Sequence, residues 1–136
     1  MATSPSINRT AIIAVKRATS GSLPIGRGGI FTGNFSADGF ALVDAPSGAD
    51  GVVHAVVVES TPSDTESGYV VLAGMSLVQL RIGSAGVTQG DKLNLQNATG
   101  VWMTAPISSQ NCYYIALQSV AANALCWAIP IASRPL

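Results

Sequence analysis

Short apolar or alternating stretches, separated by glycine, proline and asparagine, run along most of the 136-residue chain. Windows with apolar positions at helical spacing are few, because glycine and proline interrupt them. Residues 76–82 alternate strictly, which places Val78, Leu80 and Ile82 on one side of a predicted strand. Residues 51–59 are almost continuously apolar and β-branched, which is typical of a strand buried on both faces.

Strands and turns follow one another closely along the rest of the chain. Residues 28–40 and 60–68 are predicted as loops, and a turn is predicted at Ala122-Asn123. About eight or nine short strands at this spacing indicate an all-β fold, a small β-barrel or sandwich with an extended N-terminal arm. The predicted organisation is an arm and first strand over residues 1–27, followed by a single β domain over residues 28–136. The remaining predicted strands cover residues 10–15, 40–43, 69–73, 92–96, 101–104, 111–120 and 124–131.

The clearest local signal is a hairpin within residues 86–105. Leu93 and Leu95 are expected on one face, and Asn94 and Gln96 on the other, with the sequence NATG as the turn. The hairpin carries no reactive group, so it predicts structure and no chemistry.

The composition is unusual in its low charge. Hydrophobic residues make up 48% of the chain and charged residues 10%, against about 25% in an average soluble domain. Two explanations stay open: a neutral secreted β domain rich in serine and threonine, or a subunit of an obligate assembly with a charge-depleted interface. No run approaches the roughly 18 apolar residues of a membrane helix, and the first ten residues lack a signal-peptide core. No membrane partner is therefore expected.

The formal net charge is zero, which argues against a nucleic-acid partner bound through phosphate neutralisation. The distribution is uneven, because four basic residues precede the first acid and six acids follow before the next base. Chance in a sparsely charged chain is one explanation, and complementarity between subunits is the other. The basic group consists of Arg9, Lys16, Arg17 and Arg27, and the acidic group of Asp38, Asp44, Asp50, Glu59, Asp64 and Glu66.

Residues with catalytic or metal-binding potential are few. The single histidine, His54, lies in the most apolar predicted strand and is expected to be structural. Cys112 and Cys126 are not a CxxC pair; buried free thiols are favoured, with a disulfide as the alternative. Asp64 and Glu66 are interpreted as loop residues, and "PIGRGG" at 24–29 as a flexible assembly-facing loop, because it lacks the Lys-Ser/Thr ending of a phosphate loop. No enzyme, cofactor or metal is predicted.

The two tryptophans receive different predictions. Trp102 follows the hairpin turn and is expected to be half exposed, either as an anchor of a protein interface or as a sugar-stacking platform. The interface is favoured, because the acids and amides that usually accompany sugar binding do not cluster near it in the sequence. Trp127 lies in an apolar strand and is expected in the core.

The last two thirds of the chain resemble a known family. "VTQGDKLNL" at 87–95, "ATGVW" at 98–102 and "YYIALQSVAANALCWAIPI" at 113–131 are similar to the small decoration (cement) proteins of tailed-phage capsids. In that family a hairpin of the type G-D-x-L-x-L…G-x-W precedes a closing strand, and the likeness covers roughly residues 68–131. The chain has Asn123 where the family often has glycine, and asparagine also tolerates a left-handed turn.

The resemblance implies a homotrimer on the exterior of an icosahedral virion, made in the host cytoplasm, that stabilises the head by bridging major capsid protein subunits. The expected contacts to the capsid or between subunits are Arg9, Lys16, Arg17, Arg27 and Trp102. The alternative function is a carbohydrate- or receptor-binding β module of a tail fibre or spike.

Overall fold

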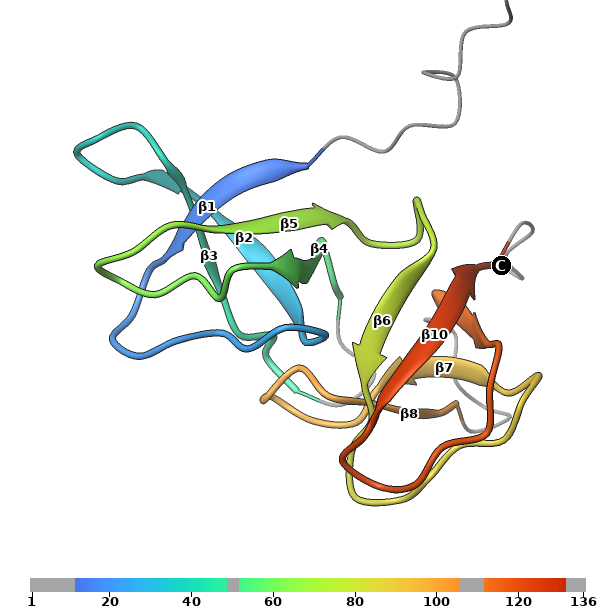
Figure 1. The fold of residues 1–136 in the computed structure, drawn as a ribbon. Helices are drawn as coiled ribbons and strands as arrows, with labels where there is room; N and C mark the ends of the chain where they lie inside the picture. The colour runs from blue at the N-terminus through green and yellow to red at the C-terminus, as the bar shows by residue number, and fades with distance from the viewer. Residues whose placement is uncertain (1–11, 49–51, 106–111, 132–136) are drawn as a thin grey trace, which may run out of the picture.

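The computed structural model describes residues 12–48, 52–105 and 112–131, and these form ten strands in two sheets (Figure 1). The predicted all-β class is thus confirmed. No helix within the described residues is long and apolar enough to cross a membrane. The strands are β1 (Ile13–Arg17), β2 (Gly28–Phe35), β3 (Ala41–Asp44), β4 (Ala55–Glu59), β5 (Gly68–Leu72), β6 (Val78–Arg81), β7 (Lys92–Leu95), β8 (Trp102–Thr104), β9 (Tyr114–Ala116) and β10 (Leu125–Pro130).

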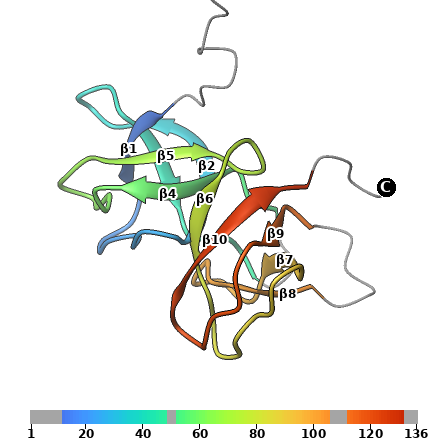
Figure 2. The same cartoon turned by 45° about the vertical axis from the view of Figure 1, so that its right-hand side comes forward.

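Strands β1 to β5 close into a barrel in the order β1-β3-β2-β4-β5 (Figure 2). Closure depends on β1, which pairs parallel with β3 and antiparallel with β5. The predicted first strand is therefore part of the same β body as the strands that follow residue 28. The interior of the barrel is filled by small aliphatic side chains, namely Val15, Leu23, Val43, Ala55, Val57 and Val70.

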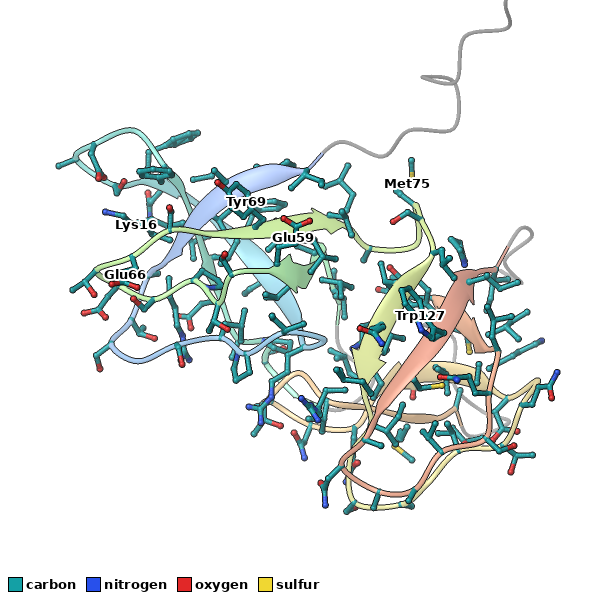
Figure 3. All side chains as sticks on the ribbon, viewed as in Figure 1. Lys16, Glu59, Glu66, Tyr69, Met75 and Trp127 are labelled. Carbon is teal, nitrogen blue, oxygen red and sulfur yellow. The ribbon has the colours of Figure 1, made fainter. Side chains whose placement is uncertain are left out.

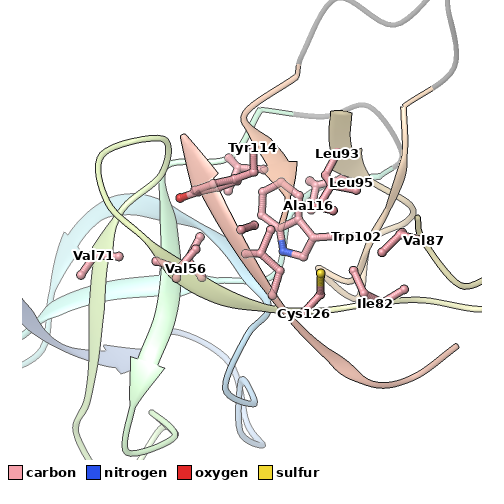
Figure 4. Close-up of a cluster of buried hydrophobic side chains, with 14 residues drawn as sticks. Val56, Val71, Ile82, Val87, Leu93, Leu95, Trp102, Tyr114, Ala116 and Cys126 are labelled. Carbon is pink, nitrogen blue, oxygen red and sulfur yellow. The ribbon is translucent and has the colours of Figure 1, made fainter. Parts of the chain in front are cut away.

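Strands β6 to β10 form the second sheet, in the order β6-β10-β9-β7-β8. Its inner face carries a larger core around Trp102 and Tyr114, which also includes Val56 and Val71 from the barrel (Figure 4). Ala55 and Val57 point into the barrel, whereas Val56 between them points to the second core. Residues 55–57 are therefore buried on both faces as predicted. The predicted strand over residues 51–59 is too long at its start, because β4 begins at Ala55 and Val52 and His54 are exposed.

Trp102 joins the second sheet to the barrel. Its side chain is 0% exposed, and its Nε1–H donates a hydrogen bond to the carbonyl of Gly26 at 3.1 Å. The ring meets Tyr114 edge to face at a centroid distance of 5.4 Å, a geometry that aromatic pairs prefer. The prediction that Trp102 is half exposed is therefore wrong, and its side chain cannot anchor a partner in this fold.

The glycines near Trp102 lie in the turn before β2 and at the start of β2. The expected loop over residues 28–40 is wrong in its first part, because β2 runs through Gly28–Phe35. The Gly28 N–H donates to the Gly100 carbonyl at 2.8 Å, and a Cβ on Gly28 would lie 3.2 Å from the Trp102 ring. Gly26, Gly28 and Gly29 are buried, so "PIGRGG" is not a flexible loop; its glycines permit close packing.

The hairpin of β7 and β8 has the predicted pairing, with Leu95 opposite Trp102 and Leu93 opposite Thr104. Leu93 and Leu95 are buried as expected. Asn94 is buried as well, so the prediction of a polar, solvent-facing side is wrong at this position. Alternation along a strand assigns residues to faces, but it does not determine what covers each face.

The turn before β10 has the predicted conformation. Asn123 has a φ of 66°, in the left-handed region that asparagine tolerates better than most residues. Its backbone N–H donates to the Gly83 carbonyl at 3.0 Å, which ties the turn to the end of β6. Pro130 ends β10, in agreement with the expectation that it finishes the strand.

Replacing Trp102 should destabilise the fold strongly. We expect Trp102→Ala to lower the free energy of unfolding by about 3–5 kcal/mol, because it removes a buried aromatic ring. Trp102→Phe should cost less, because it keeps an aromatic ring and loses the hydrogen bond to Gly26. Urea unfolding followed by circular dichroism measures both, with Phe35→Ala, at a 65% exposed side chain, as the control. Equal losses in Trp102→Ala and Phe35→Ala would contradict the buried position of Trp102.

The Asn123 turn offers a matched pair of substitutions. Asn123→Ala should reduce stability by about 1 kcal/mol, because alanine is strained at positive φ. Asn123→Gly should be close to neutral, because glycine adopts this conformation without strain. Thermal unfolding of both variants tests this, and an alanine variant as stable as the glycine variant would contradict it.

Candidate functional site

The outer face of the second sheet is apolar and exposed. The register places Trp127 on β10 opposite Gln79 on β6, and Ile129 opposite Ile115 on β9. Leu117, directly after β9, donates its backbone N–H to the Trp127 carbonyl at 2.8 Å. These strands bury their alternate residues in the core, so the remaining side chains form one surface. We call this surface the outer apolar face and define it as Leu77, Ile115, Leu117, Trp127 and Ile129.

The exposure on this face is high for large apolar residues. Trp127 is 42% exposed and Leu77 is 55% exposed, and Trp127 lies in front of β6 and β10 in Figure 3. The prediction that Trp127 belongs to the core is wrong. The sequence signal was an apolar run through β10, but Cys126 and Ala128 fill the core while Trp127 lies on the other side. Exposed apolar side chains on one sheet face make this face the candidate interaction site.

A shallow hollow lies beside Trp127, where the second sheet meets the barrel. It has a volume of about 140 Å³, and its wall combines side chains from β4, β6, β10 and the segment after β1. One lining side chain is an amide and the others are apolar. The lining residues are Ile25, Val58, Leu77, Val78, Gln79 and Trp127. The hollow is therefore suited to an apolar side chain of a partner.

The charges on the strands of this face are basic. Lys92 on β7 lies opposite Ile115, and Arg81 on β6 lies opposite Leu125. The Arg81 Nη1 donates to the Asn123 carbonyl at 2.8 Å, which holds the guanidinium at the margin. No acidic residue occupies a described strand position on this face. The outer apolar face thus has a basic margin.

The predicted basic contacts lie elsewhere, on the barrel. Lys16 Nζ is 2.8 Å from a carboxylate oxygen of Asp38 and 5.2 Å from the centre of the Phe40 ring. Arg17 Nε is 3.1 Å from a carboxylate oxygen of Asp44. Both cations are thus paired with acids of the same chain. Arg27 is partly buried, and its Nη1 donates to the Thr99 carbonyl at 3.5 Å.

These ion pairs lower two carboxyl pKa values. The hydrogen bonds from Lys16 and Ser36 lower the pKa of Asp38 from 3.8 to about 2. Burial of Asp44 alone would raise its pKa. The hydrogen bonds that Ala45, Arg17 and Thr19 donate to it more than offset the burial, so its pKa is lowered overall. Both carboxylates therefore favour the folded state in their charged form.

The four described residues among the five predicted contacts do not form one surface. Lys16 and Arg17 lie on β1, Arg27 lies at the junction with the second sheet, and Trp102 lies in the core. Arg9 lies outside the described residues. Contact roles for the four basic residues stay predictions, while the exposed tryptophan on the surface is Trp127.

The single histidine and the two described cysteines have different surroundings. His54, predicted within the apolar strand, lies just before β4 with an exposed side chain, and its Nδ1 accepts a hydrogen bond from the Phe31 N–H at 3.0 Å; its structural role stays a prediction. Cys112 and Cys126 are buried free thiols, as favoured, and burial raises the pKa of Cys126. Within residues 12–48, 52–105 and 112–131, no three His, Cys, Asp or Glu side chains are placed to hold a metal ion.

The fold of this chain is similar to that of a solved structure. No protein-family model matches the chain, and no curated protein matches it in sequence. Among solved structures, the chain is similar to the N base of head fiber gp8.5 in bacteriophage phi29, with a TM-score of 0.68. The likeness covers 94% of this chain and 99% of that chain, at 11% sequence identity. The two-sheet arrangement as a whole is therefore shared.

The aspartate ion pairs predict an acid-sensitive stability. A carboxylate whose pKa is lowered by folding stabilises the protein above its unfolded-state pKa and loses that effect as the pH falls through the folded-state value. We expect Asp44→Asn to be less stable than the unsubstituted chain by about 1 kcal/mol at about pH 6, a difference that shrinks toward about pH 2. Urea unfolding at both pH values measures it. Asp64→Asn, in the exposed loop, is the control, and a difference independent of pH would contradict the ion pair.

Proposed function

We propose that the chain is a structural protein of a phage virion, attached to the exterior of the head as a homotrimer and bound to the major capsid protein. The observation that carries this proposal is the likeness to the N base of a phage head fiber over nearly the whole length of both chains. The resemblance of residues 68–131 to capsid decoration proteins supports the same location. Bridging of neighbouring capsid subunits is the stabilising role we assign to it.

The exposed apolar side chains of the molecule support a role as a subunit of an assembly. Half-exposed Trp127 and exposed Leu77 lie on one sheet face with few charges, where an isolated protein would be expected to have polar side chains. Burying this face against a neighbour removes apolar area from water at about 25 cal/mol per Å², before the costs of ordering. The segment around Arg9, which precedes the described residues, is the proposed arm toward an acidic neighbour.

Carbohydrate binding is the second candidate, because Trp127 is exposed and lies opposite the amide of Gln79. An exposed aromatic ring beside an amide is suited to stacking on a sugar. However, the wall of the adjoining hollow is apolar apart from Gln79. A protein partner therefore fits this surface better.

Labelling of purified virions tests the proposed function. We expect an antibody against this chain to label the heads of particles from the phage that carries the gene, and mass spectrometry to find the chain in those particles. Gold label on the tail alone would favour the receptor-binding alternative. Absence from purified virions, with the chain present in infected cells, would contradict a virion role. Glycan binding that is lost in Trp127→Ala would support the carbohydrate candidate.

A further inference from the structure

We infer that the outer apolar face packs against the barrel of a second copy of this chain, in a head-to-tail contact. The inference rests on the proposed homotrimer and assigns its contact surfaces. The receiving surface is the acidic barrel surface, which we define as Glu59 on β4, Tyr69 on β5, and Asp64 and Glu66 in the loop between these strands. Figure 3 shows Glu59, Glu66 and Tyr69 on the barrel, and Trp127 on the second sheet.

The area of the outer apolar face matches what one partner of an interface needs. Leu117 is 40% and Ile129 is 37% exposed, in addition to Leu77 and Trp127. With about 200 Å² for a fully exposed large side chain, these four residues offer about 350 Å² of apolar surface. A standard interface buries about 800 Å² per partner, of which somewhat more than half is apolar. The face is therefore large enough to form most of the apolar part of such a contact.

The charges of the two surfaces favour a second copy as the partner and a head-to-tail orientation. The outer apolar face has Arg81 and Lys92 at its margin, with no acid on its described strand positions. The acidic barrel surface has three exposed carboxylates, and none of them forms an ion pair within the described residues. The cation next to this surface is Lys16, which Figure 3 shows near Glu66 and which is paired with Asp38. One protomer thus carries two separate surfaces of opposite charge. Such complementarity steers association and fixes the register of a contact.

The same charges disfavour a face-to-face dimer. If two outer apolar faces met, Lys92 and Arg81 of one copy would approach the same cations of the other, and like charges at an interface are unfavourable. A contact between two different surfaces avoids this. When such a contact repeats from copy to copy, the copies form a closed ring if the rotation between neighbours divides a full turn. A ring of three copies is the proposed trimer.

The hollow beside Trp127 provides the place for an anchor. Its wall of Ile25, Val58 and Leu77 is apolar, and an aromatic side chain in such a hollow contributes strongly to binding. Tyr69 is the aromatic side chain that the acidic barrel surface offers, because it lies opposite Glu59 across β4 and β5 and is exposed. We assign Tyr69 of the second copy to this hollow.

Mixing two variants tests the contact. Light scattering should give the unsubstituted chain a mass about three times its 13.9 kDa. Trp127→Glu disables the outer apolar face, and Tyr69→Glu disables the acidic barrel surface, so each variant alone should have the monomer mass. Each retains one intact surface, so the two variants mixed should form a one-to-one pair.

Phe35→Glu is the control, because it changes an exposed aromatic side chain outside both surfaces and should keep the full mass. Leu77→Glu changes the outer apolar face at a position outside the strands and should also give the monomer mass. Circular dichroism checks that each variant is folded.

The outcomes separate the contact from the proposed function. A monomeric unsubstituted chain, or a folded Trp127→Glu variant of full mass, would overturn the contact, whether or not the chain is found on virions. Monomeric variants that do not pair on mixing would also overturn it. A Tyr69→Glu variant that stays oligomeric while Trp127→Glu is monomeric would overturn it as well and favour a face-to-face contact. An oligomer that behaves as expected but is absent from virions would support the contact and overturn the virion role.

Discussion

The structure depends on the contact between Trp102 and the glycine segment that enters β2. A hydrogen bond from the indole to Gly26, and the close approach of the ring to Gly28, hold a closed barrel and a second sheet together. The barrel alone would bury a small core, because its interior is lined mostly by valine and alanine. Val56 and Val71 extend the core of the second sheet into the barrel wall. Trp102, the largest fully buried side chain among the described residues, therefore packs at the junction of the two units.

Much of the fold could be predicted from residue patterns, since strands with one or two buried faces have distinct signals. The alternation at β6 and the β-branched run at β4 gave the correct faces. The start of β2 was missed because its glycines resemble turn residues. Gly28 instead packs tightly against Trp102, and Gly29 packs tightly against the Asp44 carbonyl; both partners are remote in sequence. Local patterns do not contain that information.

The candidate site was harder to predict, for a definite physical reason. Both faces of β10 are apolar, so the sequence shows an apolar run and does not indicate which face is covered. The roles of Trp102 and Trp127 were consequently exchanged. The charge pattern was also informative only in part: Lys16 and Arg17 pair with Asp38 and Asp44 across the barrel, so most of the described basic cluster is neutralised within the chain. Among the described acids that follow in the sequence, Glu59, Asp64 and Glu66 are exposed and form no ion pair with a described residue.

These features have a common consequence for the surface. Lys16 and Arg17 pair with Asp38 and Asp44, so they do not neutralise the acids at β4, at β5 and in the loop between them. The second sheet has basic residues at the margin of its outer apolar face. The chain therefore has one acidic and one basic surface, although its formal net charge is zero. In the head-to-tail contact that we propose, the apolar side chains are buried in an orientation that also brings opposite charges together, and such complementarity disfavours other orientations.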